Sequence, residues 1–555
     1  MEDTLSRHIY ELFGIELMPT VSRPDVAFGD YASNVALQLA SQLSRPPREV
    51  AEELAEALRR SGEFADVSVA GPGFINVRVS DASLTQSLEV MLQPGYGRST
   101  AYAGKTVVTE YSDPNPFKVL HAGHFYTSVV GDAMSYLIED AGGTVHRVNF
   151  GGDVGLHVAK TIWAIQQELG GEEPDKLNDV PAAERAEWMA RSYVAGTNAY
   201  EDDETARRAI VALNKQIYQL HADKDHDSPI AQLYWTCRTW SYDYFNAFYD
   251  RIGTHFEKYY PESETAPIGL ATVLEQKEKG VYKDSDGAVI FEGEPYGLHT
   301  RVFVNKEGLP TYEAKDVGLS IKKWQDYHFD ESVIITGNDI TEYMKVVLKS
   351  IEQFQPELAH RTRHVTHGNV KLAGGVKMSS RKGNFLRAVD VIETAADANQ
   401  AAVGNRDDAT VIGAIKYSFL KNRVGPDIIF DPKESVATQG NSGPYLQYAH
   451  ARAVSILEKS VASDQSIEGF DEVERPLLVK LTEYPDVIAA ATQQLAPHLI
   501  CTYLYELAQI FNRFYEQSRI IGDPREAGRV RLVQAYASIL KDGLQRLGIH
   551  APDKM

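Results

Sequence analysis

The chain contains very little cysteine. Only Cys237 and Cys501 occur among its 555 residues, far apart and without a neighbouring Cys or His at the spacing of metal ligands. This scarcity excludes a disulfide framework and a zinc ribbon, both of which need several cysteines at short intervals. Both residues are interpreted as thiols of the hydrophobic core.

Long apolar runs are also missing. With 43% hydrophobic and 24% charged residues, the composition is typical of a globular protein in water, and no run approaches the ~20 apolar residues that a membrane span needs. The first residues, MEDTLSRHIYELF, contain no basic segment followed by an apolar stretch, so neither a signal peptide nor a transit peptide is expected. A cytoplasmic protein without a membrane partner is predicted.

An excess of basic residues, which would mark a nucleic-acid-binding protein, is absent as well. The formal net charge is −21, and phosphate neutralisation needs Lys and Arg on the contact face. The acidity is uneven, however, because residues 396–555 hold 17 basic and 20 acidic residues whereas 161–250 hold 8 basic and 16 acidic ones. A polyanion could therefore bind the C-terminal region, provided that its basic residues cluster.

The first hundred residues predict a small α+β unit. Apolar spacing indicates helices over 34–44 and 47–60, and the alternating stretch 67–80 indicates two strands around the turn Gly71-Pro72-Gly73. A chain of 555 residues is far longer than one hydrophobic core supports. A first domain boundary is therefore placed near residue 103.

The middle of the chain predicts an interrupted α/β domain. From residue 106 a strand, a polar loop, a helix from about Gly123 to Ala141 and a second strand form a βαβ pattern. Residues at about 160–250 are mostly helical and acidic, as expected of an insertion. Strand-like pieces then return at 289–304 and 332–336.

The C-terminal part predicts only helices. After about residue 395 strand signals disappear, and long amphipathic stretches indicate a helical bundle. These stretches are 444–459, 477–495, 499–519 and 529–547.

The sharpest local motif is His121-Ala122-Gly123-His124, at the entrance to the first helix of the βαβ pattern. A helix N-terminus offers N–H groups and a positive dipole end, glycine lets a nucleotide approach the backbone, and imidazoles donate to phosphate oxygens. The motif therefore suits triphosphate binding. Two histidines that merely cap a helix are the structural alternative.

A second motif is the glycine-flanked basic segment 374–384, GGVKMSSRKGN, which contains Lys377, Arg381 and Lys382. Cations on a loop can close over the β- and γ-phosphates and offset the charge that builds as pyrophosphate leaves. A solvated basic turn is the alternative for this segment alone. The presence of the histidine motif earlier in the same chain argues against that alternative.

In this order the two motifs resemble the H-I-G-H and K-M-S-K-S signatures of class I aminoacyl-tRNA synthetases, and the resemblance narrows to the arginyl enzymes. The stretch EYSDPNPFKVLHAGHFYTSVVGDAMSYLIEDAG is similar to that family's active-site entry. FGDYASNVALQLA, AGPGFIN, NSGPYLQYAHAR and the final GIHAPDKM resemble family segments outside the catalytic core. The resemblance thus extends over nearly the whole chain.

The resemblance implies a multidomain α/β fold. A Rossmann-like class I catalytic domain would cover 104–395, with the helical insertion inside it. An N-terminal α+β tRNA-elbow-binding domain would cover 1–103, and an all-α anticodon-binding bundle would cover 396–555.

The implied activity is that of an arginine–tRNA ligase. Such an enzyme activates L-arginine with ATP to arginyl-adenylate and transfers it to the 3′-terminal adenosine of tRNA(Arg), releasing AMP and pyrophosphate. ATP with Mg²⁺ is the expected co-substrate, and neither zinc, another protein-bound metal, nor an organic cofactor is expected. The enzyme is expected to act as a monomer on arginine, ATP and tRNA.

The resemblance assigns catalysis to His121, His124, Lys118 and Lys377. Ser380 stands where the second lysine of K-M-S-K-S belongs, and Lys118, which precedes the histidine motif, is expected to replace that lysine. An ordinary loop lysine is the alternative for Lys118. The expected ATP-binding residues are His121, Gly123, His124, Lys377, Met378, Ser379, Arg381 and Lys382.

An arginine substrate needs acids in its pocket. Its planar guanidinium carries five donors and is best matched by carboxylates, with neutral acceptors and an aromatic wall around them. Tyr312 and Asp316 are four residues apart and share one face if their segment is helical. The expected arginine-binding residues are Glu110, Asn115, Tyr312, Asp316 and Asn338.

Tyr445, Tyr448 and Arg452 fall on one helix face, an arrangement suited to stacking unpaired bases and holding phosphate. A tyrosine stripe that packs in a core is the alternative. The expected tRNA-binding residues are Asn76, Tyr445, Tyr448, Arg452, Tyr515 and Met555.

The sequence also departs from the family pattern. The usual N-H-I-G-D-W-G-T-Q reads NFGGDVGLH here, with Phe150, Val154 and His157 at changed positions, and an expected Gln-x-x-His pair is replaced by Asn338 and Thr341. Two rival hypotheses therefore stay open. One is a class I synthetase for another amino acid, and the other is a catalytically silent tRNA-binding protein.

Overall fold

The structure is a computed structural model that describes residues 1–24, 28–373, 386–460 and 469–555. Its centre is a sheet of five parallel strands in the order β12-β11-β5-β6-β7. The strands are β5 Thr106–Glu110, β6 Thr144–Gly151, β7 Lys258–Pro261, β11 Glu331–Gly337 and β12 Thr362–His367.

Both faces of this sheet are buried, as the apolar runs of parallel strands require. Val107 and Val333 point into a core shared with α5 (Ala122–Asp140) and the C-terminal helices. Val108 and Ile334 point into a second core on the opposite face. The predicted βαβ unit is confirmed, since β5 and β6 pair in parallel on either side of α5 in the chain.

The second core is built by a group of helices with a small antiparallel sheet of order β10-β9-β8. The helices are α10 Glu262–Glu278, α11 Tyr312–Tyr327, α12 Thr341–Glu352 and α13 Pro356–His360, with η4 Glu294–Tyr296 and η5 Asn338–Ile340. The strands are β8 Lys283–Ser285, β9 Ala288–Phe291 and β10 Arg301–Val304.

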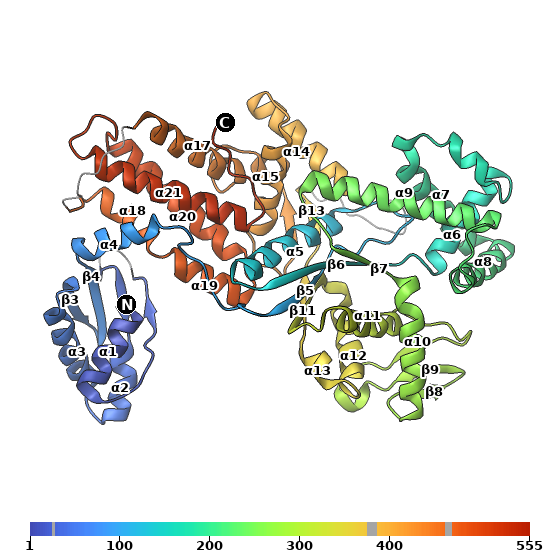
Figure 1. The fold of residues 1–555 in the computed structure, drawn as a ribbon, viewed down its shortest axis with the longest axis horizontal. Helices are drawn as coiled ribbons and strands as arrows, with labels where there is room; N and C mark the ends of the chain where they lie inside the picture. Colours follow the sequence, from blue (N-terminus) through green and yellow to red (C-terminus); the bar gives the residue numbers. More distant parts are fainter. Residues whose placement is uncertain (25–27, 374–385, 461–468) are drawn as a thin grey trace.

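The predicted insertion is helical and has a core of its own. It lies at the opposite end of the molecule from the N-terminal domain (Figure 1). Its elements are α6 Leu156–Leu169, η2 Pro174–Asp179, η3 Ala182–Glu184, α7 Arg185–Asp202, α8 Glu204–Asp223 and α9 Pro229–Ile252.

The N-terminal domain is the α+β unit that the sequence predicts. A four-stranded antiparallel sheet of order β1-β2-β4-β3 packs against three helices around a separate core. The elements are α1 Glu2–Phe13, β1 Val21–Ser22, β2 Tyr31–Ser33, α2 Val35–Leu43, α3 Pro47–Ser61, β3 Phe64–Ala70 and β4 Phe74–Val79, followed by α4 Asp81–Met91.

The C-terminal part is the predicted helical bundle, and the predicted fold class is confirmed. Its helices are α14 Ala388–Val403, α15 Asp408–Leu420, α16 Pro432–Ser435, α17 Gly443–Lys459, α18 Glu474–Leu481, α19 Tyr484–Gln494, α20 His498–Gln517 and α21 Glu526–Arg546. The boundaries near 103 and 395 stay predictions. No helix in the described ranges is both long and apolar enough to cross a membrane.

Two predictions about this bundle are wrong in detail. A strand does occur after residue 395, because β14 (Ile428–Phe430) pairs in parallel with β13 (Val370–Leu372). Three residues are too few to show a strand pattern. The stretch 477–495 forms two helices instead of one. Pro485 has no N–H, and its ring clashes with the carbonyl four residues earlier, so α18 ends at Leu481 and the proline lies in the first turn of α19.

Candidate active site

The loop between β5 and α5 leaves the carboxyl end of the central strand in an unusual conformation. Ser112, Asp113 and Phe117 all have positive φ angles, of 73°, 48° and 66°. Each is held by a hydrogen bond from a distant element. The Asp113 carboxylate accepts from the Phe150 N–H at 2.7 Å, and the Phe117 N–H donates to Ser241 Oγ at 2.9 Å. Such held, costly backbone conformations cluster at functional sites.

The histidine motif forms a reciprocal cap at the start of α5. His121 Nδ1 accepts from the Gly123 and His124 N–H groups at 3.1 and 3.4 Å, and His124 Nδ1 accepts from the His121 N–H at 3.1 Å. The two rings stack with centroids 3.7 Å apart. A Cβ on Gly123 would lie 2.8 Å from the His121 ring, so only glycine allows this stack.

The cap fixes the protonation of both rings. Burial, reinforced by the Lys118 charge, lowers the pKa of His121 to about 4, and burial together with the His121 charge lowers the pKa of His124 well below its usual value. Each ring is therefore neutral at pH 7, and because Nδ1 accepts, the ring proton sits on Nε2. The pair offers two Nε2–H donors at a helix N-terminus, where anions bind.

The chain that follows the second motif is fastened to the first. The Ala122 N–H donates to the Leu386 carbonyl at 2.8 Å, and the Ala388 N–H donates to the Leu120 carbonyl at 2.9 Å. The residues that directly follow the second motif thus lie beside the first motif. The predicted residues Lys377, Met378, Ser379, Arg381 and Lys382 lie outside the described residues.

Lys118 reaches over an aromatic ring of the insertion. Its Nζ lies 4.5 Å from the centre of the Tyr193 ring on α7. The lysine also acts on the histidine motif, since its charge is among the causes that lower the pKa of both imidazoles. It is therefore a cation beside the expected nucleotide site.

Two buried ion pairs lie beside the loop. Glu110, at the end of β5, is only 2% exposed and pairs with the equally buried Lys323 of α11. Glu262, at the start of α10, is 3% exposed and lies 2.5 Å from Lys315 Nζ. Glu110 is thus a buried residue with a charged partner and does not lie on the surface.

Among the described residues, two further carboxyl groups in the same region form no ion pair with a lysine. Burial, together with the Glu110 charge, raises the pKa of Asp113 well above its usual value. Burial also raises the pKa of Asp316 to about 8, although a hydrogen bond from Tyr343 opposes the shift. The region therefore holds four carboxyl groups against two buried ammonium groups. This imbalance suits a cationic ligand.

The remaining residues predicted to bind arginine differ in how close to this region they lie. Asn115 Oδ1 accepts from the Gly152 N–H at 2.8 Å, and Tyr312 is 57% exposed at the start of α11, with Lys315 Nζ 5.1 Å from its ring. Asn338 is exposed, and its carbonyl accepts from Thr341 Oγ1 at 2.8 Å. Asn338 is the first residue of η5 and Thr341 the first of α12, so this hydrogen bond lies within the turn that joins the two helices.

Sequence reasoning missed the partners of the acids. Lys323 lies seven residues after Asp316 on α11 and is therefore on nearly the same helix face, a signal that was present. Tyr343 comes from a different helix, α12, and no local pattern links it to Asp316. Lys315 had no signal either, since its partner is 53 residues away.

The segment that departs from the family pattern is well supported in the structure. The Asp153 side chain is fully buried and accepts from Ser263 Oγ at 2.7 Å and Arg238 Nε at 2.9 Å. His157 Nε2 lies 2.7 Å from the Gly152 carbonyl, and burial lowers the pKa of His157 to about 3. A neutral His157 thus donates its Nε2–H to the Gly152 carbonyl.

The predicted anticodon residues form one surface of the bundle. The Arg452 guanidinium lies 4.9 Å from the Tyr448 ring and 5.3 Å from the Tyr515 ring. Both rings are more than 40% exposed, at 43% and 42%, so they are not a core stripe. Tyr445 is half-buried, and its hydroxyl accepts from Asn512 at 2.8 Å. Met555 is 52% exposed at the end of the chain.

Asn76 is placed less favourably for RNA contact. Its side chain is 6% exposed, within the N-terminal sheet. The accessible side chains nearby are Phe74, at 41%, and Phe28, at 59% exposed. A contact by the Asn76 side chain would therefore require a small local opening.

Comparison with known proteins assigns each part of the chain to a family model. "Arginyl tRNA synthetase N terminal domain" matches residues 1–79, "tRNA synthetases class I (R), catalytic domain" matches 88–431, and "DALR anticodon binding domain" matches 446–555. Together the three models follow the chain in the order that the sequence predicts.

Curated relatives match along their full length. Arginine–tRNA ligase of Porphyromonas gingivalis is 26% identical, with 100% of this chain and 99% of the relative covered. The corresponding protein of Clostridium perfringens is 29% identical, with the same coverage. Among solved structures, the arginyl-tRNA synthetase of Thermus thermophilus shares the fold with a TM-score of 0.80 at 23% identity, covering 100% of this chain and 99% of that one.

Proposed function

Since the chain belongs to the arginyl-tRNA synthetase family, we propose that the loop after β5, the cap of α5 and the buried acids of α10 and α11 form its active site. The chain is an arginine–tRNA ligase. It uses ATP to attach arginine to tRNA. The roles of individual residues are the proposal developed below.

The excess of carboxyl groups over lysines carries the assignment of the arginine pocket. Glu110 and Glu262 have lysine partners, whereas Asp113 and Asp316 form no ion pair with a lysine in the described part of the chain. A guanidinium that enters beside Asp316 supplies the missing charge and makes two parallel hydrogen bonds to one carboxylate. Its arrival also favours the ionised form of Asp316. Tyr312 provides an aromatic wall at the start of the same helix.

The cap of α5 is assigned to the nucleotide. The Nε2–H groups of His121 and His124 donate to phosphate oxygens, and the N-terminal dipole of α5 adds to the attraction. Gly123 lets the phosphates approach the backbone. Lys118, held near this cap by Tyr193, stabilises the negative charge that builds on the departing pyrophosphate. Lys377 is assigned the same task from the second motif.

The reaction then proceeds in two transfers. A carboxylate oxygen of arginine attacks the α-phosphorus of ATP, the bond to the β-phosphate breaks, and pyrophosphate leaves from the opposite side. A ribose hydroxyl of the 3′-terminal adenosine of tRNA next attacks the arginyl carbonyl, and AMP leaves. ATP enters as its Mg²⁺ complex. Holding both reactants in line accounts for much of the acceleration.

The tRNA is proposed to lie along the N-terminal domain and the bundle. Arg452 between two exposed tyrosine rings offers a cation with two stacking platforms, which suits unpaired anticodon bases. The action as a monomer and the cytoplasmic location stay predictions.

ATP–pyrophosphate exchange tests the proposal. Exchange is expected with the complete set of arginine, ATP and tRNA, and not when another amino acid replaces arginine. Exchange with a different amino acid would favour a synthetase of other specificity. Normal tRNA binding on filters without any exchange or charging would favour a silent tRNA-binding protein.

A further inference from the structure

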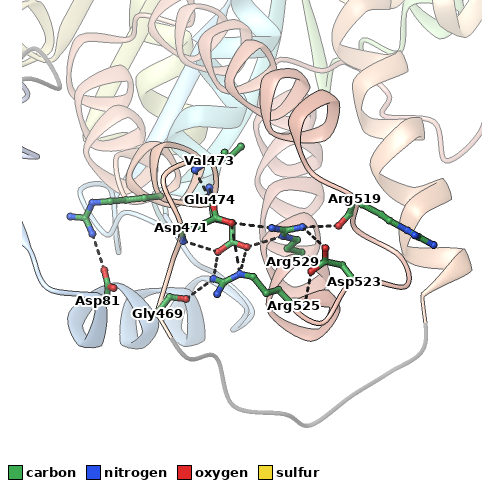
Figure 2. A network of polar contacts seen from close by, with 10 residues as sticks. Asp81, Gly469, Asp471, Val473, Glu474, Arg519, Asp523, Arg525 and Arg529 are labelled. Atoms are coloured by element: carbon green, nitrogen blue, oxygen red, sulfur yellow. Dashed lines mark hydrogen bonds and ion pairs between the residues drawn. The ribbon is translucent and has the colours of Figure 1, made fainter.

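Two consecutive residues at the start of α18 face in opposite directions. Glu474 is 2% exposed and accepts from Arg525 Nε at 2.9 Å and Arg529 Nε at 2.8 Å. Asp471 adds a contact to Arg529 at 3.0 Å and also caps the helix by accepting from the Glu474 N–H. Figure 2 shows these acids enclosed by the two arginines. The start of α18 is thereby fixed on the bundle.

Arg475, the next residue, reaches the N-terminal domain. Its guanidinium donates to Asp30 Oδ2 at 2.7 Å, to the Val79 carbonyl at 2.8 Å and to Asp81 Oδ1 at 3.1 Å. Asp81 lies on α4, beside the start of α18, in Figure 2. Three acceptors from 445, 396 and 394 residues earlier in the chain thus converge on one cation.

Within the described residues this contact is the most buried ion pair between the two parts. The side chains of Arg475 and Asp30 are each 10% exposed, whereas Arg531 and Glu89 are 27% and 47% exposed, and Arg23 and Asp486 are 23% and 78% exposed. Asp30 also accepts from the Val79 N–H at 2.7 Å, so the end of β4 is tied to the same carboxylate. Removing the guanidinium would leave a buried carboxylate without its charge partner, which is strongly unfavourable.

We propose that Arg475 is a positioning residue for tRNA. It fixes the N-terminal domain on the bundle, so that the RNA-binding surfaces of both parts hold one tRNA at a set separation. This inference rests on the proposed function, in which both parts contact tRNA. Two linked surfaces bind far more tightly than either alone only while the link keeps them at the right spacing. Loosening the link therefore weakens tRNA binding without touching the pocket for arginine and ATP.

The test compares the charging kinetics of Arg475→Gln with those of the wild-type protein. We expect the KM for tRNA to rise about tenfold, because part of the advantage of linked binding is lost. The kcat at saturating tRNA and the KM for arginine should stay within about twofold of wild type, since neither depends on the spacing at saturation. Small-angle X-ray scattering of the free protein should show a larger radius of gyration.

Arg7→Gln is the matched control, because Arg7 forms an exposed ion pair with Glu63 inside the N-terminal domain. Arg7→Gln should change neither the KM for tRNA nor the radius of gyration. If the wild-type protein does not charge tRNA, the proposed function fails; if it charges and Arg475→Gln keeps the wild-type KM for tRNA, the positioning role fails.

Should Arg475→Gln not fold, Arg475→Lys and Asp81→Asn decide the matter. A lysine can keep the Asp30 contact but cannot span all three acceptors, and Asp81→Asn weakens one of them by removing its charge. Each should raise the KM for tRNA by a smaller factor. An unchanged KM in both variants would overturn the inference.

Discussion

Replacing Tyr343 with Phe removes a single hydroxyl from the arginine pocket. In the structure this hydroxyl donates to Asp316 Oδ2, and the hydrogen bond favours the ionised carboxylate. The ring itself stays, packed with Arg301, whose guanidinium lies 5.3 Å from its centre. The change therefore tests one hydrogen bond with little loss of packing.

The expected size follows from the Asp316 carboxyl, whose pKa burial raises to about 8. A hydrogen bond to a charged group contributes about 1.5–3 kcal/mol, and about 1.4 kcal/mol corresponds to one pH unit. Losing the donor should thus raise the pKa of Asp316 further, by about one to two pH units. At pH 7 roughly a tenth of Asp316 is ionised in the wild type, and this fraction would fall about 10- to 100-fold in Tyr343→Phe.

The assay is the pH dependence of kcat/KM for arginine between pH 6 and 9, measured by charging at saturating ATP and tRNA. This ratio reports the free enzyme. The wild-type ratio should reach half its maximum near pH 8 and level off towards pH 9, whereas that of Tyr343→Phe should still rise steeply at pH 9. The kcat should change little, because bound guanidinium itself keeps Asp316 ionised.

Tyr296→Phe is the control, since Tyr296 is exposed and donates to Gln353 at a distance of 2.8 Å outside the site. Its profile should match that of the wild type. Coincident profiles for Tyr343→Phe and wild type would refute the role of this hydrogen bond. A profile without a rising limb in the wild type would refute the role of Asp316.

Two further predictions concern the nucleotide side of the site, and a third concerns the pH dependence of stability. Lys118→Ala should lower the rate of arginine activation about 100-fold, within the range for removing one transition-state donor. Tyr193→Leu should lower this rate about fivefold in the wild type, as the loss of a cation–π contact of about 1 kcal/mol requires, but should have no effect in the Lys118→Ala background. Tyr193→Phe, which keeps an aromatic ring, should leave the rate unchanged. Equal effects of Tyr193→Leu in both backgrounds would argue against that contact. Gly123→Ala should raise the KM for ATP, because the added Cβ would lie 2.8 Å from the His121 ring and displace it; an unchanged KM for ATP would contradict this. Finally, His157 stays neutral in the folded protein down to about pH 3 but is protonated in the unfolded chain below about pH 6.5. The contribution of His157 to the free energy of unfolding is therefore complete above pH 6.5 and is lost as the pH falls. Urea unfolding should show that the free energy of unfolding decreases from pH 6.5 to 5, and this decrease should be up to about 2 kcal/mol smaller in His157→Gln than in the wild type.

Local sequence signals were enough to predict the frame of the site. The alternation in β5, the polar loop and the cap before α5 are all features of neighbouring residues, so their periodicity and chemistry are visible in the chain. The same holds for the helix face that carries Tyr448 and Arg452.

The contacts that tune the site were not predictable in the same way. Glu110 and Lys323 are 213 residues apart, and Tyr343 and Asp316 come from separate helices. Which side chains meet depends on how helices pack on the sheet, and several registers of that packing would satisfy the same apolar pattern. Asn338 illustrates the limit, because its exposed position follows from the short helix η5 after β11.

The core on one face of the central sheet has a consequence for how the molecule comes apart. Val107 and Val333 of the sheet share this core with α5 and with residues as far along the chain as Leu544. The N-terminal sheet and its three helices have a separate core, and so does most of the insertion, although Phe245, Phe248 and Ile252 at the end of α9 pack into the shared core. The sheet and the bundle should consequently melt in a single cooperative step, whereas the N-terminal sheet with its helices can melt on its own. Cutting the chain near residue 395 would strip the sheet of half its covering, and the fragment left behind would aggregate instead of acting as a smaller enzyme.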